Sequence, residues 1–306
     1  MKILLAAPRG FCAGVNMAVE ALDRALAILG TPLYVFHEIV HNRHVVERFR
    51  GKGAVFVNDL AEVPRGGNVM YSAHGVSPAV QKLALDRGLN VIDATCPLVR
   101  KVHLEARRFA EQGYTIVLIG HAGHDEVVGT LGYVPDRMHL VESPGDVDRL
   151  RIDDAEKVAF LTQTTLSVDE ANVIIERLKR RYPGCVGAPK EDICYATQNR
   201  QEALKRLLPL ADSVLVVGSR NSSNSNRLVE IAREFGCPAW LVDDAAELDE
   251  RWFAGKQAVM VTAGASAPED LVMDCVEALC QWFGATVEEH ALREEQVEFP
   301  LPLEVR

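Results

Sequence analysis

The sequence predicts an α/β protein in which mostly parallel sheets are covered by helices. Short apolar runs alternate along the chain with amphipathic stretches, which is the pattern of consecutive βα units. Sharp helix start signals follow several of these runs. Small polar residues, histidines and cysteines gather in the loops just before the expected helices. Open α/β sheets bind their ligands at this edge, so the loops are the expected site.

The expected elements follow from these patterns in chain order. Strands are expected at residues 2–7, 33–37, 68–73, 90–94, 114–120, 158–162, 213–218, 239–242 and 258–262. Helices are expected at residues 15–29, 78–87, 98–112, 168–181, 198–210, 226–235 and 268–283. Ser167 and Glu170 have the spacing of a capping box, and Pro78 and Pro268 each suit the first position of a helix.

The length of 306 residues exceeds the size at which one core keeps growing, so more than one domain is expected. The positions of Cys12, Cys96 and Cys194 divide the chain into comparable βα segments. We therefore expect α/β domains at residues 1–96, 97–193 and 194–283, followed by a tail at 284–306. The first strand can pack with the third domain.

Composition and charge exclude several classes of protein. A net charge of -10 argues against a broad nucleic-acid interface, which needs a basic surface. No window approaches the roughly 18 uncharged apolar residues that span a membrane, so no membrane association is expected. The apolar run after Met1 and Lys2 is too short for a secretory signal, which makes a cytoplasmic location the expectation.

Seven cysteines in a chain without a secretory signal argue against a disulfide framework, and the chain lacks any CxxC pair. Cys12, Cys96 and Cys194 each lie at a junction before an expected helix, where exposed amides favour a thiolate that can bind a metal. Each could instead be a small buried residue, and their spacing does not identify the metal. The other four are interpreted as structural: Cys185, Cys237, Cys275 and Cys280.

Polar residues at strand ends indicate an anion site. His41, His74 and His124 each follow an apolar run, and together they suggest a clamp for an anion. Hydroxyl and amide groups precede several expected helices: Thr164, Thr165, Ser222, Ser223, Asn224 and Ser266. Plain helix capping is the alternative for these groups. The sequence contains neither a GxxxxGK[ST] nor a GxGxxG loop, so a ligand smaller than a nucleotide is expected, and a diphosphate fits.

Glu126 is the carboxylate expected to act as a proton donor. In a dry pocket beside a metal and a bound anion, desolvation and like charge favour the protonated acid. The alternative is an exposed glutamate at a helix start beside Asp125.

Nine ordered segments together resemble the 4-hydroxy-3-methylbut-2-enyl diphosphate reductase family, and the resemblance covers nearly the whole chain. They are PRGFCAG at 8–14, IVHN at 39–42, AHG at 73–75, DATCP at 93–97, GH at 120–121 with HDEV at 124–127, TQTTLS at 162–167, DICYATQ at 192–198, NSSNSNR at 221–227 and TAGASAP at 262–268.

The resemblance implies a trefoil of three pseudo-equivalent α/β domains around one central 4Fe-4S cluster. It implies that Cys12, Cys96 and Cys194 hold three irons, which leaves the fourth for the substrate hydroxyl. The implied diphosphate ligands are His41, His74, Ser222, Asn224 and Ser266, with Ser223 and Thr165 as weaker candidates. His124 would serve substrate binding and proton supply, and Glu126 with Thr164 would relay protons. The family often has proline where this chain has Asp125, which bears on the local rigidity and the acidity of Glu126.

The implied reaction removes the hydroxyl of a small allylic diphosphate and gives isopentenyl and dimethylallyl diphosphate, with electrons from a ferredoxin or flavodoxin. Such donors are acidic, so a basic docking patch is expected. The candidates are Arg100, Lys101, Arg107 and Arg108, or Lys179, Arg180 and Arg181. A solvated helix face is the alternative for either run. The competing functions are a non-redox iron-sulfur dehydratase and a phosphate-ester binding protein with structural zinc.

Overall fold

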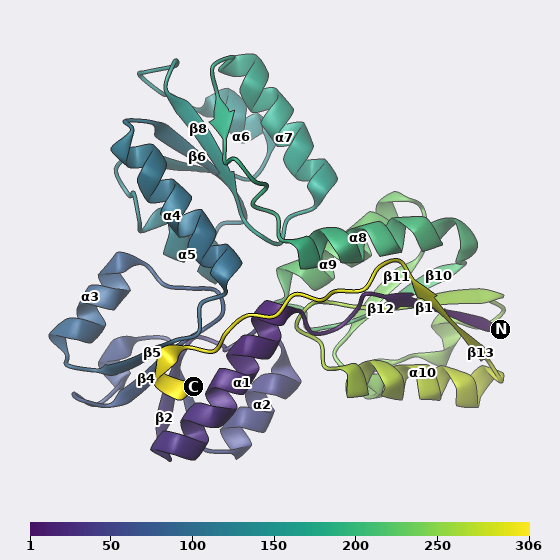
Figure 1. Cartoon of the computed structure of the whole chain (residues 1–306). Coiled ribbons are helices and arrows are strands. Elements are labelled where there is room, and N and C mark those ends of the chain that lie inside the picture. The colour runs from purple at the N-terminus through teal and green to yellow at the C-terminus, as the bar shows by residue number, and fades with distance from the viewer. The chain divides into compact units, whose positions relative to one another are not determined.

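The computed structural model describes residues 1–306, and the contacts within the chain divide it into two compact units. Figure 1 labels the elements along the chain. One sheet belongs to the first unit and two sheets belong to the second. The first unit comprises Met1–Asn16, His41–Arg48 and Tyr195–Glu298, and the second comprises Met17–Val40, Phe49–Cys194 and Phe299–Arg306.

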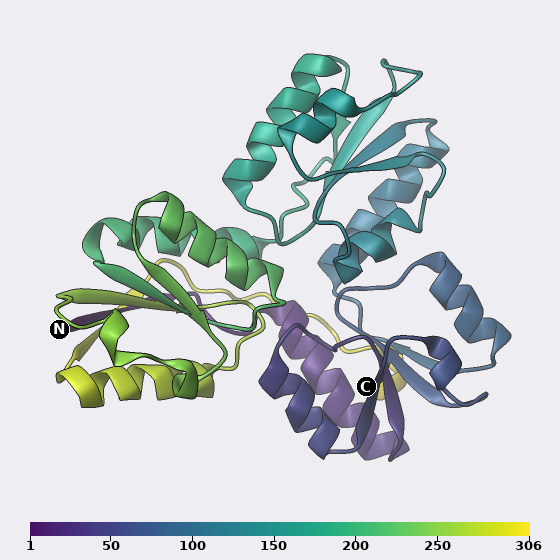
Figure 2. The same cartoon turned by 180° about the vertical axis from the view of Figure 1, so that it is seen from behind.

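The first unit contains a five-stranded parallel sheet with both faces covered. Every residue of β10 is buried, as expected for a strand between two helix layers. α8 and α9 pack on one face and α10 on the other (Figures 1 and 2). In spatial order the strands are β11 (Ala239–Val242), β10 (Ser213–Val217), β12 (Ala258–Ala263), β1 (Lys2–Ala7) and β13 (Thr286–Ala291). The helices are α8 (Tyr195–Leu207), α9 (Ser223–Glu234) and α10 (Glu269–Phe283).

The second unit begins with a four-stranded parallel sheet. Val69 and Tyr71 of β4 pack with Val80 and Ala84 of α3 in one apolar cluster. In spatial order the strands are β3 (Ala54–Val57), β2 (Leu33–Phe36), β4 (Asn68–Tyr71) and β5 (Asn90–Asp93). The helices of this part of the chain are α1 (Ala13–Leu29), α2 (Arg43–Gly51) and α3 (Pro78–Asp86), of which α1 up to Asn16 and α2 up to Arg48 belong to the first unit.

The other sheet of the second unit is also parallel, and its side chains alternate between two cores. Val117 and Ile119 of β6 join the cluster of α6 and α7, while Ile116 and Leu118 join that of α4 and α5. In spatial order the strands are β7 (Met138–Val141), β6 (Thr115–Ile119), β8 (Val158–Thr162) and β9 (Val186–Gly187). The helices are α4 (Pro97–Glu111), α5 (Asp125–Leu131), α6 (Pro144–Arg149) and α7 (Val168–Arg181).

The predicted α/β class with parallel sheets is confirmed, and the strands form three sheets. The helix starts at Pro78 and Val168 are confirmed, whereas Pro268 is the N-cap residue of α10 and the helix begins one residue later. Seven short elements were not predicted: α2, β3, α5, β7, α6, β9 and β13. Elements of this length contain too few residues for a clear periodicity.

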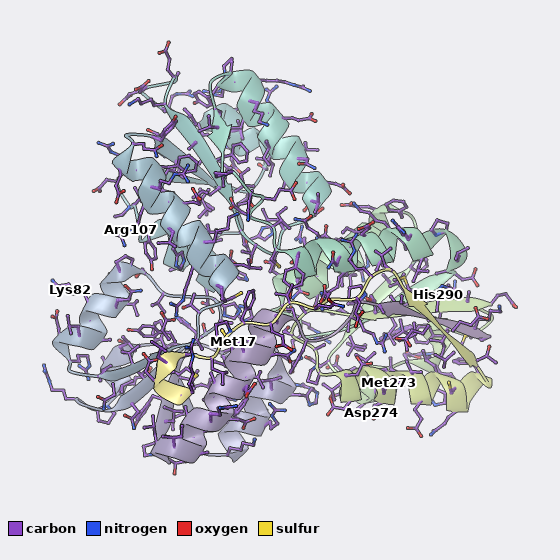
Figure 3. The ribbon with its side chains drawn as sticks, viewed as in Figure 1. Met17, Lys82, Arg107, Met273, Asp274 and His290 are labelled. Carbon is purple, nitrogen blue, oxygen red and sulfur yellow. The ribbon has the colours of Figure 1, made fainter.

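The helices carry polar residues on their outer faces. Lys82 on α3, Arg107 on α4 and Asp274 on α10 are exposed (Figure 3). No helix has both the length and the apolar character that crossing a membrane requires.

Candidate active site

Three cysteines stand at the starts of three helices. Cys12 immediately precedes α1, Cys96 is the N-cap residue of α4, and Cys194 immediately precedes α8. All three are partly buried, and none forms a disulfide. Amides at a helix N-terminus and the helix dipole favour a thiolate, which is the form that binds a metal. These three thiols therefore have the local setting of metal ligands.

Three of the four remaining cysteines have a different setting: Cys185, Cys237 and Cys275. Burial raises the pKa of the Cys185 and Cys275 thiols to about 12. Burial also raises the pKa of the Cys237 thiol. Because a protonated thiol is a poor metal ligand, these residues suit the interior of the fold. The chemistry of the donor set thus fits a soft metal or an iron-sulfur cluster at Cys12, Cys96 and Cys194.

Two of the cysteines are tied to loops that carry predicted site residues in the second unit. The Cys96 amide donates a hydrogen bond to the carbonyl of Ala73 at 3.0 Å. Ala73 directly precedes His74. The Cys194 amide donates to the carbonyl of Thr164, also at 3.0 Å. Each of these two cysteines is therefore held by its own backbone beside a loop of the predicted site.

Glu126 and Thr164 form a buried pair in the second unit. Glu126 is 2 % exposed and lies in the first turn of α5, and Thr164 follows β8 and is 5 % exposed. The Thr164 amide donates to Oε1 of Glu126 and its hydroxyl donates to Oε2, both at 2.7 Å. The parallel pairing of β6 with β8 brings their following loops together. Both carboxylate oxygens are thereby oriented by one residue.

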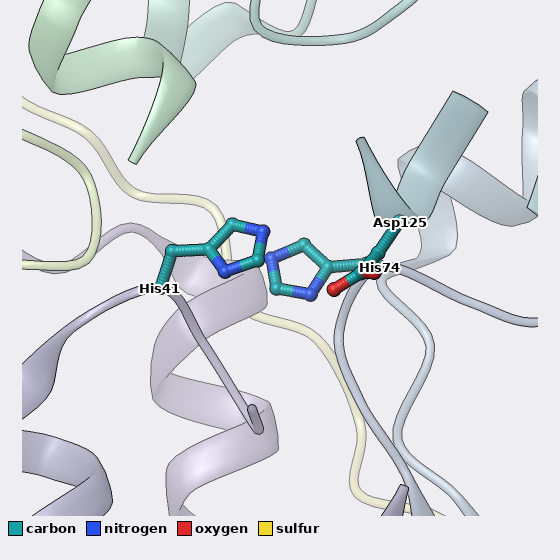
Figure 4. A group of neighbouring side chains, drawn as sticks. All are labelled: His41, His74 and Asp125. Atoms are coloured by element: carbon teal, nitrogen blue, oxygen red, sulfur yellow. The ribbon is translucent and has the colours of Figure 1, made fainter. Parts of the chain in front are cut away.

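Two histidines lie on the same side of the second unit as Glu126 and Thr164, and one of them contacts Glu126. His124 caps α5, and its Nδ1 accepts a hydrogen bond from the Glu126 amide at 3.2 Å. The rings of His74 and His124 meet edge to face with centroids 5.9 Å apart. Nitrogen and carboxylate atoms of His74 and Asp125 lie within 4.8 Å of each other (Figure 4).

Sequence reasoning missed two residues of this site. His37 has a φ of 60°, which is uncommon for a residue other than glycine, and its Nδ1 lies 3.6 Å from Oδ1 of Asp125. Gln163 accepts from the His121 amide and donates to the Thr165 hydroxyl at 2.8 Å. The position of Gln163 directly before the two predicted threonines was the available signal.

The first unit ties Cys12 to its own group of predicted residues. The Cys12 amide donates to the carbonyl of Ala265 at 3.2 Å, directly before Ser266. The Ala265 amide in turn donates to the side-chain oxygen of Asn224 at 2.7 Å. Cys12 is therefore held in the same way as Cys96 and Cys194, because its amide donates to a loop that carries a predicted ligand of the diphosphate.

Hydroxyl and amide groups of the first unit form one connected network. Asn224 donates from Nδ2 to the Ser222 hydroxyl at 2.9 Å, and the hydroxyls of Ser222 and Ser266 lie 3.4 Å apart. The Ser266 hydroxyl donates to the carbonyl of His41 at 2.9 Å. Because β10 and β12 are parallel neighbours, the loops after them meet here. The network joins four of the predicted diphosphate ligands.

The first unit also contains site residues that the sequence did not single out. The Ser225 hydroxyl donates to that of Ser222 at 3.0 Å, so Ser222 accepts two hydrogen bonds and its own proton faces the Ser266 hydroxyl, which donates to His41. Asn42 is fully buried beside His41, and its Nδ2 has no partner, as in a site that completes itself with an acceptor ligand. Ser223, which the sequence did predict, is the first residue of α9 and is partly buried.

Most of the cations proposed for docking have partners within the chain. Arg100 pairs with Asp93 at 2.9 Å, and Lys101 donates to the carbonyls of Lys190 and Glu191 at 2.7 Å. Arg107 is exposed on α4 (Figure 3).

The second candidate run is likewise engaged within the chain. Lys179 lies over the ring of Phe160, Arg180 lies 3.5 Å from Glu176, and Arg181 donates to the Asp148 carbonyl at 2.8 Å. A docking role for either run stays a prediction.

Comparison with known proteins shows the family of this chain. The model of the family described as LytB protein matches residues 3–280. The chain belongs to the LytB family. Membership implies an iron-sulfur enzyme, which agrees with the three cysteines at helix starts.

Relatives of this LytB chain match it over its whole length. A protein of Rhodopirellula baltica named 4-hydroxy-3-methylbut-2-enyl diphosphate reductase is 56% identical over 306 residues, which are 100% of this chain and 96% of the relative. A protein of Azoarcus sp. with the same name is 56% identical over 305 residues, covering 100% of this chain and 98% of the relative.

A solved structure shares the fold of this LytB chain. It is the E-1-hydroxy-2-methyl-but-2-enyl-4-diphosphate reductase from Plasmodium falciparum, with a TM-score of 0.97 and 38% identity. The match covers 99% of this chain and 96% of that one. The fold is therefore that of a known reductase structure over nearly the full length.

Proposed function

We propose that this LytB chain is a 4-hydroxy-3-methylbut-2-enyl diphosphate reductase that forms isopentenyl diphosphate and dimethylallyl diphosphate. The reaction takes up two electrons and two protons. The bond between the allylic carbon and its hydroxyl oxygen breaks, one proton leaves with that oxygen as water, and the other adds to either end of the allyl group. The names of the full-length relatives support this assignment.

The proposed cofactor is one 4Fe-4S cluster held by Cys12, Cys96 and Cys194. When bound, such a cluster supplies electrons and an iron without a protein ligand that acts as a Lewis acid toward the substrate oxygen. The division at residues 96, 193 and 283 belongs to the same proposal, because Cys96 is the last residue of the first domain and Cys194 is the first residue of the third.

The observation that carries the proposal is the pattern of cysteine amides. The amides of Cys12, Cys96 and Cys194 donate to Ala265, Ala73 and Thr164 respectively. These acceptors are, or directly precede, residues proposed to bind the diphosphate or move protons. The same short connection therefore occurs three times, in three loops far apart in the sequence.

The diphosphate is proposed to bind to neutral donors and imidazoles. Ser222, Asn224 and Ser266 form one hydrogen-bonded network that fixes their relative positions, and their hydroxyl and amide donors would turn to phosphate oxygens on binding. Ser222 lies at the N-terminus of α9, where the helix dipole adds to anion binding. His41 and His74 are the proposed imidazole ligands of the diphosphate. Ser223 and Thr165 are the weaker candidates for the same pocket.

Glu126 is proposed to give a proton to the leaving oxygen. Its burial excludes bulk water, and Thr164 fixes both of its oxygens. The first role of Thr164 is therefore to orient the acid, which restricts the direction of proton transfer. His124 is proposed to bind substrate and help resupply the proton, because its Nδ1 accepts from the backbone amide of Glu126 and its ring is thereby held beside that residue.

The electron donor is proposed to be a ferredoxin or flavodoxin, and the proposed location is the cytoplasm. An acidic donor needs a basic contact surface. Arg107 is the exposed cation of the α4 run that best suits such a contact.

Anaerobic turnover of the hydroxylated allylic diphosphate with reduced methyl viologen tests the function. We expect a brown parent protein that forms both products, a nearly inactive Glu126→Gln variant, and a control Glu111→Gln with parental rates, since Glu111 is exposed on α4. Turnover without a reductant would indicate a dehydratase, and a colourless protein would indicate zinc. An inactive parent with a full cluster would overturn the assignment.

A further inference from the structure

A buried arginine of α8 connects the Cys12 loop to the C-terminal tail. The side chain of Arg200 is 1 % exposed, and that of Glu295 is 14 % exposed. Nη1 of Arg200 lies 3.2 Å from Oε1 of Glu295, and Nη2 lies 3.4 Å from Oε2. Asn199 donates to Glu295 Oε1 at 2.8 Å. A tail glutamate is thus the carboxylate partner of a cation inside the first unit.

The guanidinium of Arg200 also donates hydrogen bonds to two backbone carbonyls. Nη2 of Arg200 donates to Gly10 at 2.7 Å, and Nη1 donates to Ala196 at 2.8 Å. Gly10 lies two residues before Cys12, and Ala196 lies two residues after Cys194. Arg200 therefore connects the loop of one proposed ligand to the helix that starts directly after another.

The Cys12 loop makes further contacts beside those with Arg200. The Ala13 amide donates to the Tyr195 hydroxyl at 3.3 Å, again joining this loop to the start of α8. Gly10 has a φ of 64°, and a Cβ there would lie 3.2 Å from the Ala267 carbonyl. The positive φ and this close approach both favour glycine at residue 10.

The charge of Arg200 makes Glu295 necessary. A guanidinium removed from water is strongly destabilising unless a carboxylate and hydrogen-bond acceptors compensate it. The carbonyls of Gly10 and Ala196 supply acceptors, but only Glu295 supplies a negative charge. Without Glu295, water or a rearranged side chain must reach Arg200, which disturbs the bond to Gly10.

We infer that Arg200 and Glu295 are positioning residues that hold the Cys12 loop in the conformation that binds the cluster, so that the C-terminal tail is a working part of the cluster site. This inference rests on the proposed role of Cys12 as a ligand. Its consequence is that a charge change in the tail weakens cluster retention without altering any ligand.

Arg200 and Glu295 together form the proposed clamp on the Cys12 loop. Hydrogen exchange and cluster loss test this clamp in the full-length protein. Glu295→Gln keeps the size of the side chain and removes its charge, and Glu294→Gln is the matched control because Glu294 is exposed in the same tail. We expect amide exchange in residues 8–16 and bleaching of the visible absorption in air to be about tenfold faster in Glu295→Gln, with both rates parental in Glu294→Gln.

A double variant separates positioning from stability. Replacing both Arg200 and Glu295 by methionine removes the buried charges together, and such replacements often restore stability. We expect the double variant to melt near the parent, yet to keep fast exchange in residues 8–16 and fast bleaching, because the bond to Gly10 is gone.

The outcomes are distinguishable from failure of the proposed function. Parental exchange in Glu295→Gln, or parental exchange and bleaching in the double variant, would overturn the clamp. A parent without any iron-sulfur chromophore would overturn the proposed cofactor instead, while exchange in residues 8–16 would still report whether Glu295 holds the loop.

Discussion

The hydroxyl of Thr164 offers a selective way to perturb the proposed acid. Thr164→Val keeps the shape of the side chain and the backbone bond to Oε1 of Glu126, but removes the 2.7 Å bond to Oε2. Because both side chains are buried, water cannot readily replace the lost partner. The carboxyl group of Glu126 then loses the hydrogen bond that Thr164 gives to Oε2.

The size of the effect follows from the type of bond that is lost. A hydrogen bond to a charged group contributes about 1.5–3 kcal/mol. If this stabilisation acts in the transition state, kcat falls by about tenfold to a hundredfold. KM should change little, because the network that is proposed to bind the diphosphate lies around Ser222 and Ser266 and is left intact.

Steady-state kinetics with reduced methyl viologen measures this effect, and Thr164→Ser is the control because it retains the hydroxyl. We expect Thr164→Ser to have a kcat near that of the parent. A Thr164→Val variant with parental kcat and the same cluster content would refute the reasoning that Thr164 orients the acid.

Three further predictions concern stability and reactivity. Burial lowers the pKa of His103 to about 4, so the stability it contributes is present above pH 6.5 and is lost as the pH falls from 6.5 toward 4; denaturant titrations should show about 3 kcal/mol more acid destabilisation in the parent than in His103→Phe, and equal pH profiles would contradict this. A Cβ on Gly75 would lie 2.8 Å from Cε1 of His103, whereas one on Gly88 meets nothing within 4 Å; thermal unfolding should show a clearly larger loss in Gly75→Ala than in Gly88→Ala, and similar losses would exclude a packing effect. Since the pKa of the Cys185 and Cys275 thiols is about 12 rather than 9.0, their thiolate fraction should be about a thousandfold lower than in the unfolded chain; mass spectrometry after iodoacetamide treatment at pH 8 should find both unmodified in the folded protein, and rapid labelling would disprove their burial.

From the sequence, the starts of the helices near the site were easier to predict than the contacts between site residues that are far apart in the chain. Ser77 and Ser167 cap α3 and α7 as their local patterns indicate, because capping depends on neighbouring residues only. The starts of α8 and α9 lie three residues earlier than expected, since polar residues in a first turn can belong to the helix or to the loop. Cys194 and Ser222 consequently stand directly before their helices.

Contacts between distant segments depend on strand order, which the local pattern does not contain. Glu126 and Thr164 are 38 residues apart and meet because β6 and β8 are neighbours. Ser222 and Ser266 meet for the same reason through β10 and β12. Their residue types were recognisable from the sequence, whereas their partners required the sheet topology.

The C-terminal tail shows most clearly which contacts the local sequence pattern could not predict. It was expected only as a tail after the third domain, and in the structure Thr286–Ala291 pairs with β1 and Glu295 is the partner of a buried arginine. Nothing in the sequence around Glu295 distinguishes it from Glu294, because the difference lies in the position of Arg200 on a helix far away in the chain.

Iron and sulfide content per chain tests the central claim most directly, when it is measured after anaerobic purification of the parent and of single alanine variants. The account predicts a four-iron cluster in the parent, loss of most of it in Cys12→Ala, Cys96→Ala and Cys194→Ala, and parental content in Cys185→Ala and Cys275→Ala. Full iron content in any one of the first three variants would contradict a cluster held jointly by these thiols.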